Sequence, residues 1–146
     1  MTISKPLTTP CIGKCSTVFG DSVCRGCQRF VHEVIDWNRY NDDQKHIIWQ
    51  RLDEYLYIIL PQFVRIYDPR KVFVAVERYQ LPQRSQNLWR NIYNLIRFKE
   101  KYGVNIEECG FSLRDNFSLP VIEQQLHELS TAFYERDFVR AQTFSI

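Results

Sequence analysis

The chain has 146 residues, of which 45% are hydrophobic and 25% are charged, and its formal net charge is +2. These values lie near globular averages, so they exclude a wholly disordered chain and leave room for one compact domain or two small ones. No run approaches the roughly 18 apolar residues that span a membrane, and the N-terminus lacks a signal-peptide core. We therefore expect a cytoplasmic protein whose thiols stay reduced.

The sequence predicts three parts in chain order. Residues 1–9, rich in Thr, Ser and Pro, are expected to form a flexible arm. Residues 10–56 are predicted to form a four-cysteine metal-binding module, and residues 57–146 a helical domain of unknown role. Glycines and other turn residues crowd the segment 10–26, which predicts loops around the cysteines.

Five later stretches have apolar residues at the three-to-four-residue spacing of an amphipathic helix. They are predicted to begin near Gln28, at the capping-box pair Asn41 and Gln44, at Pro69, near Arg84 and after Ser118. The β-branched run from Val72 to Val76 leaves a strand open as an alternative in the third. The fold class is therefore mainly α, with an N-terminal four-cysteine metal loop followed by a bundle of about five helices.

Four of the five cysteines form the pattern C-x3-C-x8-C-x2-C: Cys11, Cys15, Cys24 and Cys27. Two closely spaced cysteine pairs place sulfurs on one ion, and four thiolates complete the ligand set of a tetrahedral Zn(II) or of an iron-sulfur cubane. Both centres carry a net charge of −2, so the net charge does not distinguish a Zn(II) site from an iron-sulfur cubane. Two disulfides are the alternative, and a purely structural metal is another. Because protein thiolates fill all four coordination positions of the metal, no position is open for a substrate, and metal catalysis is not expected.

These residues resemble a family of small bacterial proteins, the YdhL type, described as predicted iron-sulfur proteins without a settled activity. The resemblance covers about residues 10–56 and rests on the four cysteines, on Arg29, Glu33 and Trp37, and on the polar helix start at Asn41. Phe30 departs from the small hydroxyl residue usual there. The resemblance implies a metal or cluster site and favours an iron-sulfur cluster over one Zn(II).

The middle third of the chain is basic, with nine Lys or Arg against three Asp or Glu between residues 57 and 102. On the helix predicted to begin near Arg84, Arg90, Arg97 and Lys101 share a face opposite the apolar stripe. Such a face is a candidate contact for nucleic acid or another partner, and a solvated basic surface is the alternative. The isolated Cys109 is expected to be a buried or turn thiol.

Three functions follow from these patterns. The first is an accessory protein whose fold is stabilised by a metal bound at the four cysteines and which offers a surface to a protein partner. The second is redox or iron-sulfur sensing, and the third is RNA or DNA binding through the basic helices of residues 65–101. Phosphate-loop, dinucleotide and nucleophile-elbow motifs are missing from the sequence, so we expect no enzyme and no small-molecule substrate.

Overall fold

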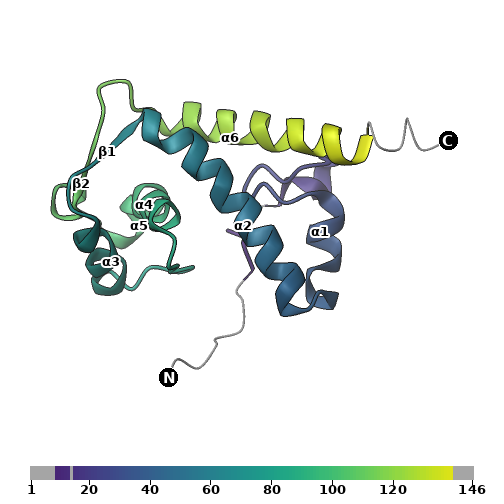
Figure 1. Cartoon of the computed structure of the whole chain (residues 1–146), viewed down its shortest axis with the longest axis horizontal. Coiled ribbons are helices and arrows are strands. Elements are labelled where there is room, and N and C mark those ends of the chain that lie inside the picture. Colours follow the sequence, from purple (N-terminus) through teal and green to yellow (C-terminus); the bar gives the residue numbers. More distant parts are fainter. Residues whose placement is uncertain (1–8, 14, 140–146) are drawn as a thin grey trace. The chain divides into compact units, whose positions relative to one another are not determined.

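The computed structural model describes residues 9–13 and 15–139, in which helices predominate and confirm the mainly α prediction (Figure 1). The flexible arm predicted for residues 1–9 falls, except for its last residue, outside the described residues. None of the described helices is long and apolar enough to cross a membrane.

The described chain forms two compact units. Unit 1 contains the residues up to Tyr55 together with those from Glu123 onward, and unit 2 spans Leu56–Ile122. The prediction had instead assigned everything after residue 56 to one helical domain. The C-terminal helix returns to unit 1 because it contacts the segment that follows the cysteines, as described below.

Unit 1 is built on a cysteine-containing loop and three helices. Its elements are the 3-10 turn Ser16–Phe19, α1 (Val31–Asp36), the 3-10 turn Trp37–Arg39, α2 (Asp42–Ile59) up to residue 55, and α6 (Leu119–Tyr134) from residue 123, followed by the π-helical turn Glu135–Val139. The core of unit 1 consists of side chains from these helices and from the loop, among them Phe30, Trp37, Leu52, Tyr55 and Leu126.

The predicted capping box opens α2 as expected. The backbone N–H of Gln44 donates to Oδ1 of Asn41 at 2.9 Å, and the backbone N–H of Asn41 donates to Oε1 of Gln44 at 2.9 Å. Two N–H groups that lack helical partners are thereby satisfied. The helix ends at Ile59, two residues before Pro61, whose ring and missing N–H disfavour a further turn of α-helix.

The first helix begins later than predicted. It starts at Val31 rather than near Gln28, whose φ of 65° is left-handed and incompatible with a helix. A short hairpin uses these residues instead: the N–H of Cys24 donates to the carbonyl of Arg29 at 2.9 Å, and that of Val31 to Ser22 at 2.8 Å. Strand-like pairing therefore replaces the predicted first turn of the helix.

Unit 2 combines helices with a two-stranded antiparallel sheet. Its elements are the 3-10 turn Leu60–Gln62, β1 (Val64–Ile66), α3 (Pro69–Arg78), α4 (Leu88–Arg97), α5 (Lys99–Tyr102), the 3-10 turn Ile106–Glu108 and β2 (Phe111–Leu113). Arg65 pairs with Ser112 at the centre of the sheet. The sequence did not predict this sheet, because three-residue strands are too short to show a period of two.

The start of α3 agrees with its sequence. Asp68 caps the helix, since its Oδ1 accepts a hydrogen bond from the backbone N–H of Arg70 at 3.2 Å, and Pro69 occupies the first turn. The strand alternative for residues 72–76 is wrong. Gly110 permits the approach of this helix start to β2, because a Cβ at Gly110 would lie 2.1 Å from the carbonyl oxygen of Asp68.

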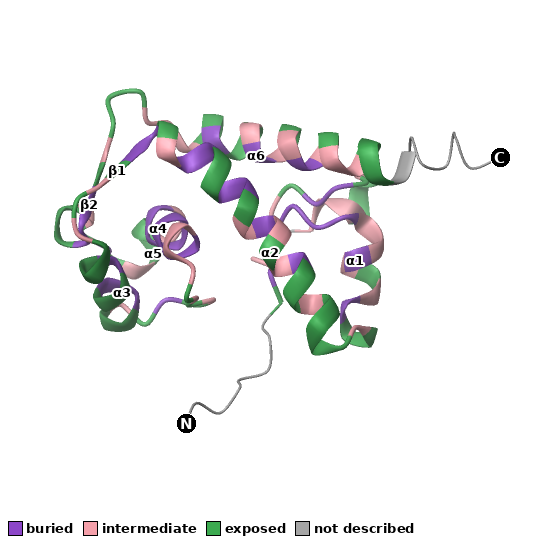
Figure 2. Cartoon of the chain, in the orientation of Figure 1, coloured by how far each residue is buried: buried purple, intermediate pink, exposed green. Residues whose placement is uncertain are grey.

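The interior of unit 2 includes a polar face of α4 as well as an apolar one (Figure 2). Asn91 and Asn94 are completely buried. The side-chain oxygen of Asn91 accepts a bond from the N–H of Ser85 at 3.0 Å, and its amide donates to the carbonyl of Ser85 at 2.7 Å. The amide of Asn94 donates to the carbonyl of Gln83 at 3.2 Å. These bonds fix the loop before α4, whose own backbone groups would otherwise lack partners.

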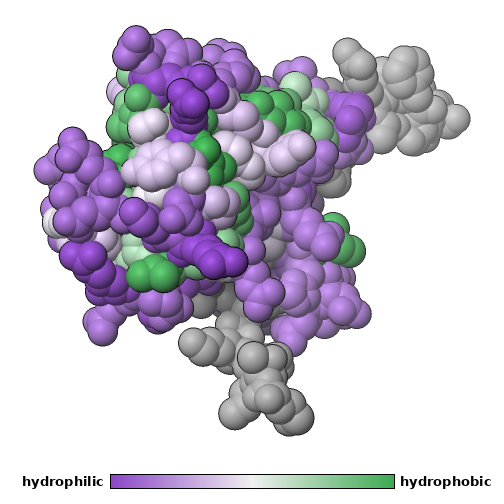
Figure 3. Space-filling view, turned by 60° about the vertical axis from the view of Figure 1, so that its left-hand side comes forward, coloured by the Kyte–Doolittle hydropathy of each residue, from purple (hydrophilic) through white to green (hydrophobic). Residues whose placement is uncertain are grey.

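The surface is largely hydrophilic with separate apolar patches, as the face in Figure 3 shows. Single exposed apolar side chains are normal on a protein surface and do not by themselves mark a binding site. The most exposed of them are Val18 and Phe19, at 74% and 88%, in the loop between Cys15 and Cys24.

Candidate metal centre

The turn Cys24 to Cys27 brings two of the four predicted ligands together. It lies at the tip of the short hairpin, and the two side chains are 1% and 8% exposed. The thiol of Cys27 donates a hydrogen bond to the sulfur of Cys24, which lowers the pKa of Cys24 to about 4 and raises that of Cys27. Burial further raises the pKa of Cys27. The two buried sulfurs therefore lie within hydrogen-bonding distance of each other.

A buried cation lies against the same sulfurs. Arg29 is 3% exposed, and its Nε donates to Sγ of Cys27 at 3.2 Å. Its guanidinium carbon lies 5.2 Å from the centroid of the Trp37 ring, a distance typical of a cation–π contact. Trp37, 6% exposed, thereby holds the positive charge of Arg29 beside a sulfur that becomes negative on losing its proton.

Cys11 and Cys15, which precede this pair in sequence, are half-buried. Sγ of Cys11 accepts a hydrogen bond from the backbone N–H of Gly13 at 3.3 Å, and Sγ of Cys15 lies 2.8 Å from Oγ1 of Thr17. In the described ranges 9–13 and 15–139, no three Cys, His, Asp or Glu side chains are grouped closely enough to hold a metal ion. The structure thus brings together Cys24 and Cys27 but not all four cysteines.

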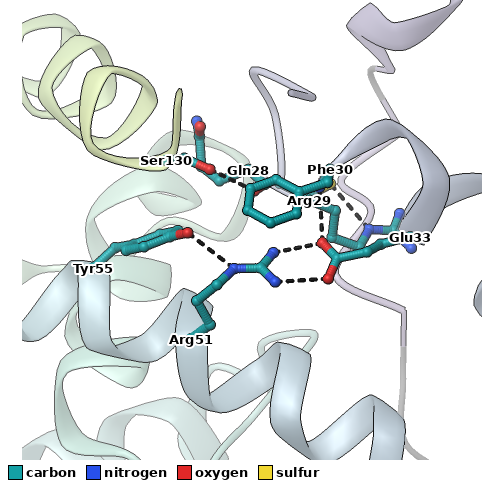
Figure 4. Close-up of polar contacts among 8 residues, drawn as sticks. Gln28, Arg29, Phe30, Glu33, Arg51, Tyr55 and Ser130 are labelled. Atoms are coloured by element: carbon teal, nitrogen blue, oxygen red, sulfur yellow. Dashed lines mark hydrogen bonds and ion pairs between the residues drawn. The ribbon is translucent and has the colours of Figure 1, made fainter. Parts of the chain in front are cut away.

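A buried ion pair supports the loop from the side of α2 (Figure 4). The guanidinium of Arg51 donates two hydrogen bonds to the Glu33 carboxylate, at 2.6 and 2.5 Å, and a third to the hydroxyl of Tyr55 at 2.9 Å. The side chains of Arg51 and Glu33 are 16% and 7% exposed. Glu33 also accepts the backbone N–H of Phe30 at 2.8 Å, so one carboxylate joins α2 to the first turn of α1.

Phe30 covers this ion pair. Its ring centroid lies 4.0 Å from the guanidinium carbon of Arg51, and its ring contacts include Tyr134 at 5.2 Å and His32 at 5.9 Å. The aromatic residue at position 30, which departs from the resembling family, therefore excludes water from a charge pair.

Arg51 is not among the residues predicted for the site. It binds Glu33, whereas Arg29, one helical turn before Glu33 in sequence, binds Cys27. One signal was available: Arg51 lies three residues after Ile48 and four before Tyr55, on the apolar face of α2. A cation on that face requires a buried partner.

Gln28 connects the cysteine turn to α6. Its carbonyl accepts a hydrogen bond from the hydroxyl of Ser130 at 2.8 Å, and Ser130 is completely buried. Its side-chain oxygen lies 3.3 Å from Nδ1 of His127, and its amide donates to the carbonyl of Arg25 at 2.7 Å. The residue that follows Cys27 is thereby fixed in a left-handed conformation that few non-glycine residues adopt.

The three cations predicted as partner contacts in unit 2 do not form one solvent-facing stripe. Arg90 is only 6% exposed. Arg97 donates to the side-chain oxygens of Asn94, at 3.0 Å, and Gln83, at 2.8 Å. Of the three, Lys101 is the one whose side chain is exposed. The prediction of an exposed stripe is wrong because α4 is buried on its polar side as well.

Cys109 is a buried structural thiol, as the sequence suggested. Its side chain is fully buried, and Sγ donates to the carbonyl of Asn105 at 3.2 Å. Burial raises its pKa to about 11. It takes no part in the cysteine pair of unit 1.

Comparison with known families gives one match. Residues 9–55 match the model of a family described as a protein of unknown function, DUF1289. The matched segment includes the four cysteines, Glu33 and Arg51, and it ends where unit 1 first ends. No curated protein and no solved structure matches the chain significantly.

Removing Arg51 should destabilise the protein strongly. Arg51→Ala leaves the Glu33 carboxylate buried without its cation, so we expect the free energy of unfolding to fall by about 3 kcal/mol in urea denaturation. Arg39→Ala is the control: its side chain is 86% exposed, its ion pair with Asp36 is 3.8 Å long, and a change below about 0.5 kcal/mol is expected. Equal effects of the two substitutions would contradict a special role of the buried pair.

Cys109 should react with iodoacetamide more slowly than Cys11 in the native protein. A buried thiol with a pKa of about 11 supplies very little thiolate near pH 7.5, whereas Cys11 is half-exposed. Peptide mass spectrometry, on protein treated with a chelator, measures both rates. The alkylation rates of Cys109 and Cys11 should become similar in guanidinium, where the protein is unfolded. Similar rates in the native protein would show that unit 2 opens readily around Cys109.

Proposed function

We propose that this protein is a small cytoplasmic metal-binding accessory protein, not an enzyme, in which Cys11, Cys15, Cys24 and Cys27 hold one metal centre. The observation that carries the proposal is the buried pair Cys24 and Cys27, with adjacent sulfurs and the Arg29 guanidinium donating to one of them. Buried thiolates need compensating positive charge, and a metal ion supplies it directly.

The chemistry of the donor set fits such a centre. Four thiolates around Zn(II), or around an oxidised cubane, give a net charge of −2, and Arg29 provides a buried positive charge next to it. The remaining ligands, Cys11 and Cys15, precede the pair in a half-buried segment. Binding would draw this segment onto the hairpin, so the metal would contribute to the folding of unit 1.

An iron-sulfur cluster is the form that we favour over one Zn(II). The support for this choice is the resemblance of residues 10–56 to proteins described as predicted iron-sulfur proteins. All four coordination positions are then filled by protein, so the centre has no open position for a substrate, and its role is structural or redox rather than that of a Lewis acid. The accessory role implies a protein partner that recognises the metal-bound form.

Redox or iron-sulfur sensing is the second candidate. It is favoured by the direct connection from Cys27 through the Gln28 carbonyl to Ser130 of α6. A change in the cluster that moves the cysteine turn would alter this bond, and α6 would transmit the change to a partner. Sensing predicts a brown, oxygen-sensitive protein.

Metal content tests the proposal. The protein, purified without oxygen, should contain iron and sulfide with visible charge-transfer absorption, or one zinc without colour. Cys24→Ser with Cys27→Ser should lose the metal, and Cys11→Ser with Cys15→Ser should lose it as well if the four act as one site. Cys109→Ser should retain it, because Cys109 lies in unit 2. Wild-type protein without metal, or metal retained by both double variants, would overturn the proposal.

Ser130 should affect metal affinity without being a ligand. Ser130→Ala removes the hydroxyl that holds the Gln28 carbonyl, so the turn after Cys27 loosens, and we expect an affinity about 10-fold lower in chelator competition with Co(II). The control is Gln124→Ala on the same helix, whose side chain is exposed and binds only Glu128. Unchanged affinity in Ser130→Ala would show that α6 does not support the metal turn.

A further inference from the structure

Exposed cations of unit 2 gather on the sheet and the start of α3 rather than on α4. Arg65 lies opposite Ser112 on the face of the sheet that points away from the buried Val64 and Phe111. Side chains two residues apart share a face of a strand, which places Tyr67 and Arg114 on the same side. The ladder extends to both, because the N–H of Tyr67 donates to Gly110 at 3.0 Å and that of Arg114 to Phe63 at 2.8 Å.

The first turn of α3 continues this surface. Lys71 packs closely against Gly110, because a Cβ placed on Gly110 would lie 2.8 Å from the Cβ of Lys71. The side chains of Arg70 and Lys71 are both exposed. We call the combined surface the ribbon face and define it by its residues: Arg65, Tyr67, Arg70, Lys71, Ser112 and Arg114. Residues that are about 45 positions apart in sequence therefore form one surface.

The four cations of the ribbon face are not neutralised by ion pairs. Within the described ranges, none of Arg65, Arg70, Lys71 and Arg114 has a carboxylate within ion-pair distance. Two nearby carboxylates are already paired with other cations: Glu108 with Arg78 and Glu77 with Arg84, both at 3.1 Å.

Three further acidic residues adjoin the ribbon face. Asp68 caps α3 through its Oδ1, Glu107 precedes the paired Glu108, and Asp115 follows Arg114. Asp68 lies in sequence between Tyr67 and Arg70, and the four cations exceed the three carboxylates by one. The surface therefore keeps a small positive excess, which suits an extended anion.

Tyr67 gives the ribbon face an aromatic group as well. Its side chain is 55% exposed, and its hydroxyl donates to the carbonyl of Glu107 at 3.2 Å. The hydrogen bond fixes one end of the ring, so the ring forms a rigid flat surface among cations. Aromatic rings of this kind stack on nucleobases while neighbouring cations bind the phosphates.

We propose that the ribbon face of unit 2 binds single-stranded nucleic acid, with Arg65, Arg70, Lys71 and Arg114 on phosphates and Tyr67 stacked on a base. A single strand fits better than a duplex because only unpaired bases expose their faces to an aromatic ring. This activity is independent of the metal centre, which lies in unit 1. The proposed contacts therefore differ from Arg90 and Arg97, which the sequence suggested, and are residues that the tertiary structure exposes.

The test is fluorescence anisotropy of the full-length protein with labelled 15-nucleotide strands, oligo-U and oligo-dT. Four phosphate contacts predict a slope of log affinity against log salt of about −3. Arg65→Ala with Arg114→Ala should weaken binding by about 10-fold or more and reduce the slope by about 1.4. Tyr67→Ala should weaken it by about 10-fold, whereas Tyr67→Phe, which keeps the ring, should bind like the wild type.

The matched control is Lys99→Ala with Lys101→Ala, which removes the same charge from exposed positions of unit 2 outside the ribbon face. It should keep most of the affinity. Equal losses in the two double variants would overturn the assignment to the ribbon face. No binding by the wild type, or equally strong binding to polyglutamate or to phosphatidylglycerol vesicles, would overturn nucleic-acid recognition. Urea denaturation confirms that each variant remains folded.

Discussion

The guanidinium of Arg51 is the point on which the structure of unit 1 depends. It binds the Glu33 carboxylate with two hydrogen bonds and the Tyr55 hydroxyl with a third, beneath the ring of Phe30. A buried charge of this kind is tolerated only while every partner is present, because the loss of one leaves an ion without solvent. The pair therefore fixes the position of α1 on α2, and with it the hairpin that carries Cys24 and Cys27.

Two further contacts complete the surroundings of the cysteine turn. Arg29, stacked on Trp37, supplies positive charge next to Cys27, and Ser130 holds the carbonyl of Gln28. One contact acts on the charge of the sulfurs and the other on the backbone that positions them. A metal centre needs both, since thiolate ligands require compensating charge and the geometry of their loop decides how many sulfurs can face one ion.

Unit 2 is organised on a different principle. Its central helix, α4, buries amides as well as apolar groups, and Asn91 and Asn94 satisfy the backbone of the preceding loop. Arg97 is held by the same network. The cations of the sheet and of the α3 start, such as Arg65, are exposed and lie outside this network, and this is why the proposed nucleic-acid surface lies there.

The sequence by itself determined the features that depend on neighbouring residues. Helix caps at Asn41 and Asp68 and the mainly α class follow from local rules, and so does the spacing of the cysteines, although their role as ligands remains a prediction. The tertiary structure alone decided that Arg51 pairs with Glu33, that Arg90 is buried and that strands 45 residues apart form a ribbon. Local patterns record propensity, whereas burial and ion pairing depend on which distant segments meet, and no short window of sequence contains that information.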